Sequence, residues 1–94
     1  MSDEFYIKGD YLVILCAYSV SYVAINTIHM IHVCSSPEYP RDYEQAPILK
    51  KAIEIVTLDD RELEISHSAN ENEVIYNFNK LRALLDEYHE HRNS

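Results

Sequence analysis

The stretch from residue 11 to residue 37 carries no charged side chain, and this feature constrains the fold more than any other. It is long enough to cross a bilayer, so a transmembrane helix is the first alternative to consider. However, polar residues interrupt the stretch, basic flanks are lacking, and valine, isoleucine and tyrosine are frequent. Because β-branched and aromatic residues favour strands, and membrane helices usually have basic flanks, we expect consecutive strands instead.

The strand-rich region is predicted to span residues 5–34 and to begin with a hairpin. Gly9, the only glycine of the chain, lies between residues 5–7 and a strand over residues 11–17. A turn at this place needs a residue that adopts positive φ, which glycine does at no steric cost. Two further strands are expected over residues 20–25 and 28–34, with a bend at Asn26 and Thr27 between them.

A long loop is predicted over residues 35–47, because its three prolines exclude a regular helix or a central strand. Loops of this length in compact domains are often functional. Tyr39 and Tyr43 flank Arg41 in this loop. Tyrosine and arginine are enriched in the energetic centres of protein interfaces, so we predict that these three residues bind a partner.

A second hairpin is predicted over residues 48–67, with its turn near Asp59 and Asp60. A two-residue turn would place Ile55 opposite Glu64 and mix apolar with acidic residues on both faces. A three-residue loop pairs Ile55 with Ile65, and a four-residue loop pairs Val56 with Ile65. We expect one of these two longer loops.

The last element is predicted to be a helix over residues 72–91. Asn70 followed by Glu73 resembles a helix N-cap with a glutamate three residues later. Apolar residues then recur at helical spacing and form one stripe, while Asn77 lies largely elsewhere. The stripe consists of Val74, Ile75, Phe78, Leu81, Leu85 and Tyr88.

These elements predict a single α+β domain over residues 1–94, in which one C-terminal helix packs on an antiparallel sheet of about five or six strands. The strand over residues 11–17 is apolar on both faces, since Val13 and Leu15 point opposite to its other apolar residues. The apolar side chains on the second face of this strand must also be shielded from water. Either the sheet curls into a small barrel closed by the helix, or Val13 and Leu15 form the interface of a two-fold homodimer, which we favour.

We predict no metal site and no cofactor. His29 and His32 are three residues apart and would face opposite ways on a strand. His67 would join one of them across the sheet, near Cys34, only with a strand order that the sequence does not specify. Cys16 and Cys34 lie in apolar runs of a chain whose start lacks a basic signal region, so reduced thiols and a cytoplasmic location are expected.

Catalytic motifs are also missing. A single glycine excludes phosphate-binding loops, dinucleotide fingerprints and the nucleophile elbow. We therefore expect a non-enzymatic protein; a small enzyme that uses His67 or the hairpin acids is the least favoured class.

The formal charge of −8 disfavours direct binding to nucleic acids or anionic membranes and favours a protein partner with a basic surface. In size and charge the chain resembles compact acidic bacteriophage proteins that block CRISPR or restriction enzymes. That resemblance implies an inhibitor whose carboxylates occupy a basic nucleic-acid groove. The candidate carboxylates are Asp59, Asp60, Glu62, Glu64, Glu71, Glu73, Glu87 and Glu90.

The alternative function is a dimeric regulatory module that holds a small molecule in a crevice. His29, His32, Tyr18 and Tyr22 are the candidate lining residues.

Overall fold

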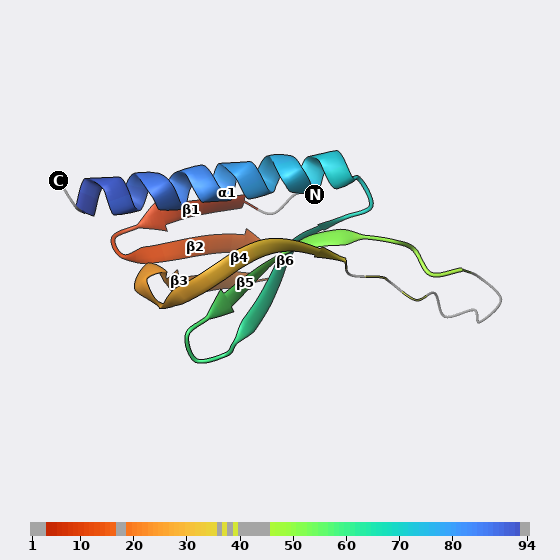
Figure 1. The fold of residues 1–94 in the computed structure, drawn as a ribbon, viewed down its shortest axis with the longest axis horizontal. Coiled ribbons are helices and arrows are strands. Elements are labelled where there is room, and N and C mark those ends of the chain that lie inside the picture. Colours follow the sequence, from red (N-terminus) through yellow and green to blue (C-terminus); the bar gives the residue numbers. More distant parts are fainter. Residues whose placement is uncertain (1–3, 17–18, 36, 38, 40–45, 93–94) are drawn as a thin grey trace.

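The computed structural model describes residues 4–16, 19–35, 37, 39 and 46–92 (Figure 1). The elements in chain order are β1 (Glu4–Lys8), β2 (Tyr11–Cys16), β3 (Ser19–Ala24), the 3₁₀ turn η1 (Ile25–Thr27), β4 (Ile28–Ser35), β5 (Lys51–Thr57), β6 (Glu62–Ser68) and α1 (Glu71–Arg92). The predicted α+β class, the antiparallel pairing and the C-terminal helix are confirmed. Most of the predicted loop over residues 35–47 lies outside the described residues.

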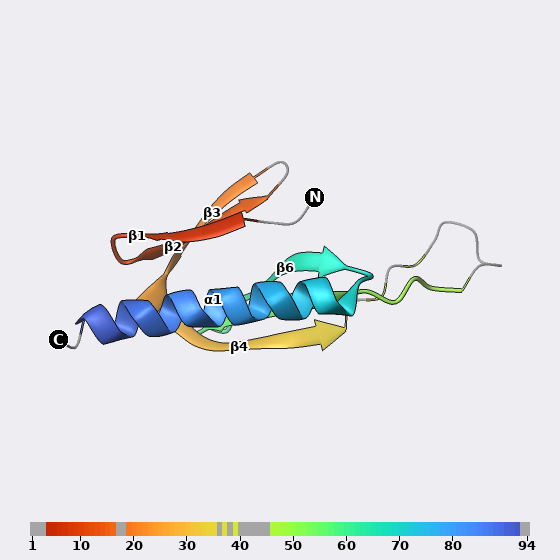
Figure 2. The same ribbon diagram turned by 90° about the horizontal axis from the view of Figure 1, so that it is seen from above.

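The strands form two sheets of three strands, so the prediction of one sheet is wrong. Sheet A has the order β1-β2-β3, and sheet B has the order β4-β5-β6 (Figure 2). The two sheets separate at η1, the position of the predicted bend. There the Thr27 hydroxyl donates a hydrogen bond of 2.6 Å to the Ala24 carbonyl, and the Ile25 amide donates one of 3.0 Å to the backbone carbonyl of Asp10. These bonds redirect the chain, so β4 starts a new sheet instead of pairing with β3.

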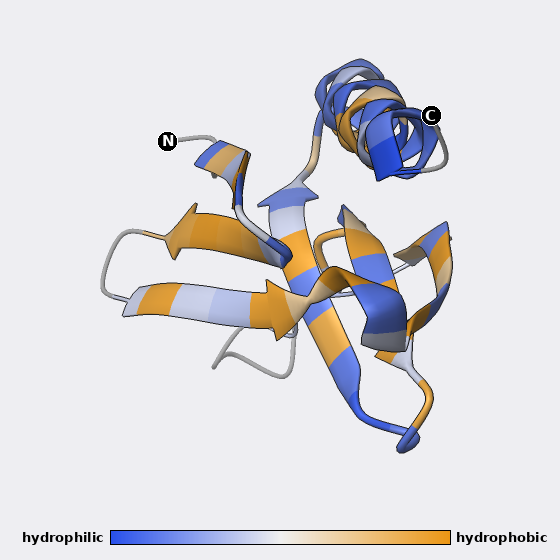
Figure 3. Cartoon of the chain, turned by 90° about the vertical axis from the view of Figure 1, so that its left-hand side faces the viewer, coloured by the Kyte–Doolittle hydropathy of each residue, from blue (hydrophilic) through white to orange (hydrophobic). Residues whose placement is uncertain are grey.

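Helix α1 packs against β1 and against all three strands of sheet B, and it closes one side of the space between the sheets (Figures 1 and 2). Its buried residues are Val74, Asn77, Leu81 and Leu85. Val74, Leu81 and Leu85 join one core with apolar side chains from both sheets and from η1, chiefly Phe5, Leu12, Ile14, Ile25, Ile53, Ile55 and Ile65. Orange and blue positions alternate along β6, the strand that leads into α1, as expected for a strand with one face on this core (Figure 3).

The described part of the uncharged stretch folds as the strands β2, β3 and β4 with η1 between the last two, in agreement with the sequence-based expectation. Among the described residues, no helix combines the length and the apolar character that crossing a bilayer requires. In α1, Ile75 belongs to the predicted stripe but is exposed, whereas Asn77 lies on the buried side. Asn77 is tolerated there because its amide donates a hydrogen bond of 2.7 Å to the Ser66 hydroxyl.

The predicted hairpin of β1 and β2 turns at Gly9, which has a φ of +62°. Its second turn residue, Asp10, connects this hairpin to the end of α1. The Asp10 carboxylate accepts a hydrogen bond of 2.7 Å from the Tyr88 hydroxyl and forms an ion pair with Arg92. The Tyr88 hydrogen bond, together with Arg92, holds the pKa of Asp10 below its ordinary value of 3.8.

We expect Tyr88→Phe to raise the pKa of Asp10 part of the way back towards 3.8, because Arg92 remains in place. A lowered folded-state pKa means that the contact stabilises the fold above the unfolded-state pKa, and that this contribution is lost as the pH falls through the folded-state value. Carboxyl resonances followed by NMR through a pH titration measure the change. Tyr76→Phe, on an exposed side chain of the same helix, is the control; an unchanged Asp10 pKa in Tyr88→Phe would contradict the assignment.

The second face of β2 is covered within the single chain at Val13. Val13 is fully buried yet lies outside the main core, and its cross-strand neighbours are Tyr6 and Tyr22. Leu15 is half-buried. The large apolar residues that sheet A exposes on this face are Tyr6, Tyr11, Val20 and Tyr22, and the expected dimer interface at Val13 and Leu15 stays a prediction.

The β5-β6 hairpin has a three-residue loop, but neither of the two predicted registers is correct. Ile53 pairs with Ile65 and Ile55 pairs with Leu63. This register differs by two residues from the Ile55–Ile65 pairing expected for a three-residue loop. The Thr57 amide donates to the Arg61 carbonyl at 3.0 Å and so closes the loop over Leu58, Asp59 and Asp60. Asp60 supplies the positive φ of 63° that this tight loop needs. Apolar residues still face one another, because the shift of two preserves the face of each side chain.

Candidate functional site

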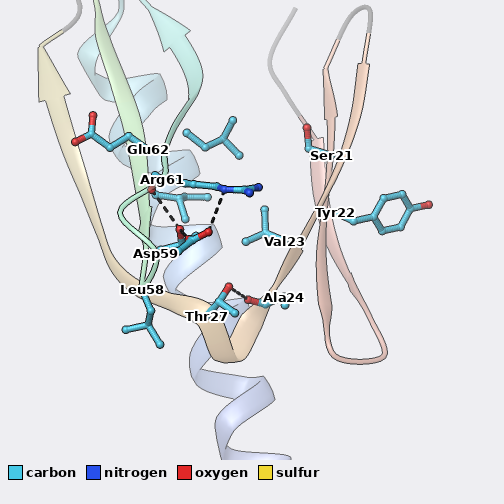
Figure 4. Close-up of a pocket in the computed structure, with 12 residues that line it drawn as sticks. Ser21, Tyr22, Val23, Ala24, Thr27, Leu58, Asp59, Arg61 and Glu62 are labelled. Atoms are coloured by element: carbon cyan, nitrogen blue, oxygen red, sulfur yellow. Dashed lines mark hydrogen bonds and ion pairs between the residues drawn. The ribbon is translucent and has the colours of Figure 1, made fainter.

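A cleft with a volume of about 550 Å³ lies between β3 of sheet A and the β5-β6 end of sheet B (Figure 4). Val23 points across it towards sheet B, whereas Tyr22 points away. The Leu58 amide donates a hydrogen bond of 2.8 Å to the Thr27 carbonyl and ties the hairpin loop to η1 beside the cleft. The lining combines apolar and polar groups: Ser21, Tyr22, Val23, Ala24, Thr27, Ile55, Thr57, Leu58, Asp59, Arg61, Glu62 and Leu63.

Charged groups lie at the hairpin side of this cleft. Arg61 Nε is 3.0 Å from Asp59 Oδ2, and the Thr57 hydroxyl also donates to Asp59. The Thr57 hydrogen bond, with smaller contributions from the backbone and Arg61, lowers the pKa of Asp59. Because Glu62 adds a second carboxylate, the formal charge of this rim is negative.

The cleft runs along two strand edges. In the described part of the chain, β3 pairs only with β2, and β6 pairs only with β5. Consecutive residues of each edge line the cleft, residues 21–24 of β3 and residues 61–63 around the start of β6. Strand edges carry backbone N–H and C=O groups that a further extended segment can pair with.

The structure distributes the predicted acidic residues over separate places. Asp59, Asp60 and Glu62 lie at the hairpin end of sheet B, while Glu71 and Glu73 lie at the start of α1. Strand β6 separates these two groups by roughly 20 Å, given about 3.3 Å per residue. Glu64 lies between them on the outer face of sheet B, which is the face turned away from the core. The carboxylates therefore do not form one continuous patch.

The other sequence-based candidates are the three loop residues and the four predicted lining residues of a small-molecule crevice. Tyr39 is exposed, and Arg41 and Tyr43 lie outside the described residues. Of the four predicted lining residues of a small-molecule crevice, only Tyr22 lines the cleft; His29 and His32 do not, and Tyr18 is outside the described residues.

A second constellation lies on the outer face of sheet B. His32, Glu54 and Glu64 are direct neighbours in register across β4, β5 and β6. His32 Nε2 is 2.5 Å from Glu54 Oε1. Cys34 lies two residues further along β4, and its sulfur and the Glu54 and Glu64 carboxylates are within 4.8 Å of one another.

His67 reaches the same face because β6 is irregular. Residues three apart on a regular strand face opposite ways, yet His67 Nε2 is 3.0 Å from Glu64 Oε2. The register of β6 shifts after Ile65, and Ser66 has a φ of 58°, as in a β-bulge that re-aims the next side chain. The buried hydrogen bond from Asn77 of α1 holds Ser66 in this conformation.

The two cysteines are free thiols on different sheets. Burial, and then the charges of Glu64 and Glu54, raise the pKa of Cys34. A raised pKa keeps the thiol protonated at neutral pH when no cation is bound, which is opposite to the activation that a nucleophilic cysteine requires.

Two candidate features could not be predicted from the sequence. The cleft depends on where β3 and the β5-β6 hairpin meet, which no local pattern specifies. The His32–Glu54 pair depends on the β4-β5 register. The only signal in the sequence is the alternation of Ile53, Glu54 and Ile55, which is typical of a strand with Glu54 on its outer face.

No protein-family model matches the sequence, and no curated protein or solved structure matches it. The class that the structure defines is an α+β domain with two three-stranded antiparallel sheets and one covering helix.

Proposed function

We propose that this chain is a small non-enzymatic protein-interaction protein that holds an extended segment of a basic partner in the cleft between the two sheets. The observation that carries the proposal is the cleft itself, which is lined along its length by the edges of β3 and β6. An extended segment would add backbone hydrogen bonds to one of these edges, and its alternate side chains would enter the apolar part around Val23 and Leu63.

Charge supports a basic partner. The whole chain has a formal charge of −8, and the cleft has Asp59 and Glu62 against one Arg61 on its rim. Lysine or arginine residues that flank the apolar part of the segment would complement this rim. A protein that handles nucleic acids has such basic surfaces, so inhibition of a nucleic-acid-binding protein remains the favoured biological role. Docking in the cleft fits the structure better than mimicry of a phosphate row, since the acidic residues are dispersed.

The test compares two tryptophan substitutions in the same strand. Ser21 is half-buried and lines the cleft, while Ser19 points to the same face of β3 but is exposed and outside the lining. We expect Ser21→Trp to fill the cleft and weaken peptide binding at least ~10-fold, about 1.4 kcal/mol, with Ser19→Trp as the matched control. Peptides selected from a random display library against the tagged chain serve as probes, and fluorescence anisotropy measures their affinity.

The selected peptides are expected to be extended, with apolar residues between basic ones, and to bind more weakly at high salt. Amide NMR shifts should localise to residues 21–24 and 61–63. Equal affinity for both tryptophan variants, or shifts elsewhere, would reject the cleft as the binding site. A pull-down from source-cell lysate then asks whether the natural partner depends on Ser21 in the same way.

The second candidate is a small-molecule-binding module, because about 550 Å³ lies within the range of roughly 300–1,000 Å³ that ligand pockets occupy. A thermal-shift screen separates the two. A small molecule that raises the Tm of Ser19→Trp but not of Ser21→Trp would favour this alternative.

A further inference from the structure

We propose that the outer face of sheet B binds one zinc ion through Cys34, Glu54 and Glu64, with His32 or His67 as the fourth ligand. This zinc site is separate from the cleft, and it does not depend on the proposed function. It contradicts the sequence-based expectation that the chain has no metal site.

The donor atoms of the three residues already lie close together. The Cys34 sulfur and the two carboxylates lie within 4.8 Å of one another. In a tetrahedral zinc site with Zn–S near 2.3 Å and Zn–O near 2.1 Å, ligand atoms are roughly 3.6 Å apart. A contraction of about 1 Å is within reach of side-chain rotation, so the strands need not move.

Two histidines beside this group can supply the fourth ligand. His32 Nε2 is 2.5 Å from Glu54 Oε1, and His67 Nε2 is 3.0 Å from Glu64 Oε2. Each imidazole therefore already approaches a carboxylate of the group. The side chains of His32, His67 and Glu64 are about two-fifths exposed, so a metal ion can enter from solvent.

The types of donor atom favour zinc over magnesium or calcium. A thiolate, carboxylates and an imidazole together suit a borderline-soft cation such as Zn²⁺. Mg²⁺ and Ca²⁺ prefer oxygen ligands alone, and a site built for them has no use for Cys34. On binding, Cys34 loses its proton to solvent and coordinates as the thiolate.

The fold brings these donors together from separate parts of the chain. Three strands contribute, and His67 joins them only because the bulge at Ser66 turns it to this face. Asn77 of α1 stabilises that bulge. A zinc ion at this place would join β4, β5 and β6, and would hold the cleft-lining end of β6 to the rest of sheet B.

The experiment uses the full chain, stripped with a chelator and then titrated with ZnCl₂, MgCl₂ or CaCl₂. We expect one bound zinc per chain by elemental analysis, and a rise in Tm on the order of 10 °C at a hundredfold excess over Kd. Mg²⁺ and Ca²⁺ should leave the Tm unchanged. Substitution with Co²⁺ should produce a thiolate-to-cobalt charge-transfer absorption.

Matched variants assign the ligands. Cys34→Ser should abolish the cobalt absorption and the zinc shift, and Glu54→Gln should weaken zinc binding at least ~10-fold. Cys16→Ser changes the other half-buried cysteine and should alter neither, and His89→Gln with His91→Gln should leave binding unchanged. The proposal is overturned if zinc fails to raise the Tm, if Mg²⁺ matches it, or if Cys34→Ser still binds zinc. Should Cys34→Ser not fold, the cobalt spectra of the unmodified chain and Cys16→Ser decide, because lack of a thiolate band in either overturns it.

Discussion

Val13→Asp is expected to lower the free energy of unfolding by about 4 kcal/mol or more. Val13 is fully buried between the cross-strand neighbours Tyr6 and Tyr22, so the new carboxylate would lie among apolar groups without a partner. Such a substitution costs about 4 kcal/mol or more. A domain of this size has a total stability of about 5–10 kcal/mol, so the variant would lose a large part of it. Urea unfolding followed by circular dichroism measures the loss.

Val20→Asp is the matched control, because Val20 is the same residue type on the same face of sheet A but is 55% exposed. We expect it to change the free energy of unfolding by less than about 0.5 kcal/mol. A Val13→Asp monomer of unchanged stability, together with a dimeric unmodified chain, would instead show that Val13 belongs to an interface between two copies. That result would support the homodimer prediction for Val13 and Leu15.

Leu81→Ala should lower the free energy of unfolding by about 3 kcal/mol. Leu81 lies in the middle of α1, is completely buried, and belongs to the core that both sheets share. Its truncation removes apolar contacts and leaves a cavity, and such substitutions cost about 2–5 kcal/mol. The midpoint of urea unfolding should fall while the slope stays constant.

Tyr76→Ala tests whether this loss is specific to the buried side of α1. Tyr76 is 69% exposed on the same helix, so its truncation should cost well under about 1 kcal/mol. If both variants lost the same free energy, α1 would not be the cover of the core, and the packing described for Leu81 would be wrong.

The cleft and the zinc site use different residues and can fail separately. Filling the cleft at Ser21 tests β3 and the start of β6, whereas Cys34 and Glu54 lie on the outer face of β4 and β5. Loss of peptide binding with intact zinc binding would support the cleft alone. The reverse pattern would support the zinc site alone.

Local physical preferences made most elements predictable. The helix over residues 72–91 follows from its apolar spacing and its Asn70 cap, and the structure extends it by one residue at each end. Gly9 located the first turn because that position needs positive φ. The bend at Asn26 and Thr27 coincides with η1.

Predictions that required long-range information were less successful. The β5-β6 register shifted by two residues, because an apolar face alone is satisfied by any even shift and the loop makes the choice. The sequence predicts that Asn77 lies outside the buried side of the helix, because a buried polar side chain needs a partner. That partner is Ser66, which lies at a bulge in another element and cannot be identified from the local sequence. His67 reached Glu64 for the same reason.

The sequence by itself determined the α+β class, the positions of the strands, the terminal helix and the acidic character of the surface. These depend on periodicity, turn chemistry and composition, which act between residues close in the chain. Only the tertiary structure decided that the strands form two sheets, that a cleft opens between β3 and β6, and that Cys34, Glu54, Glu64 and two histidines meet on one face. Those outcomes depend on which strand edges remain unpaired and on how a bulge re-aims one side chain, and both are set by packing between distant segments.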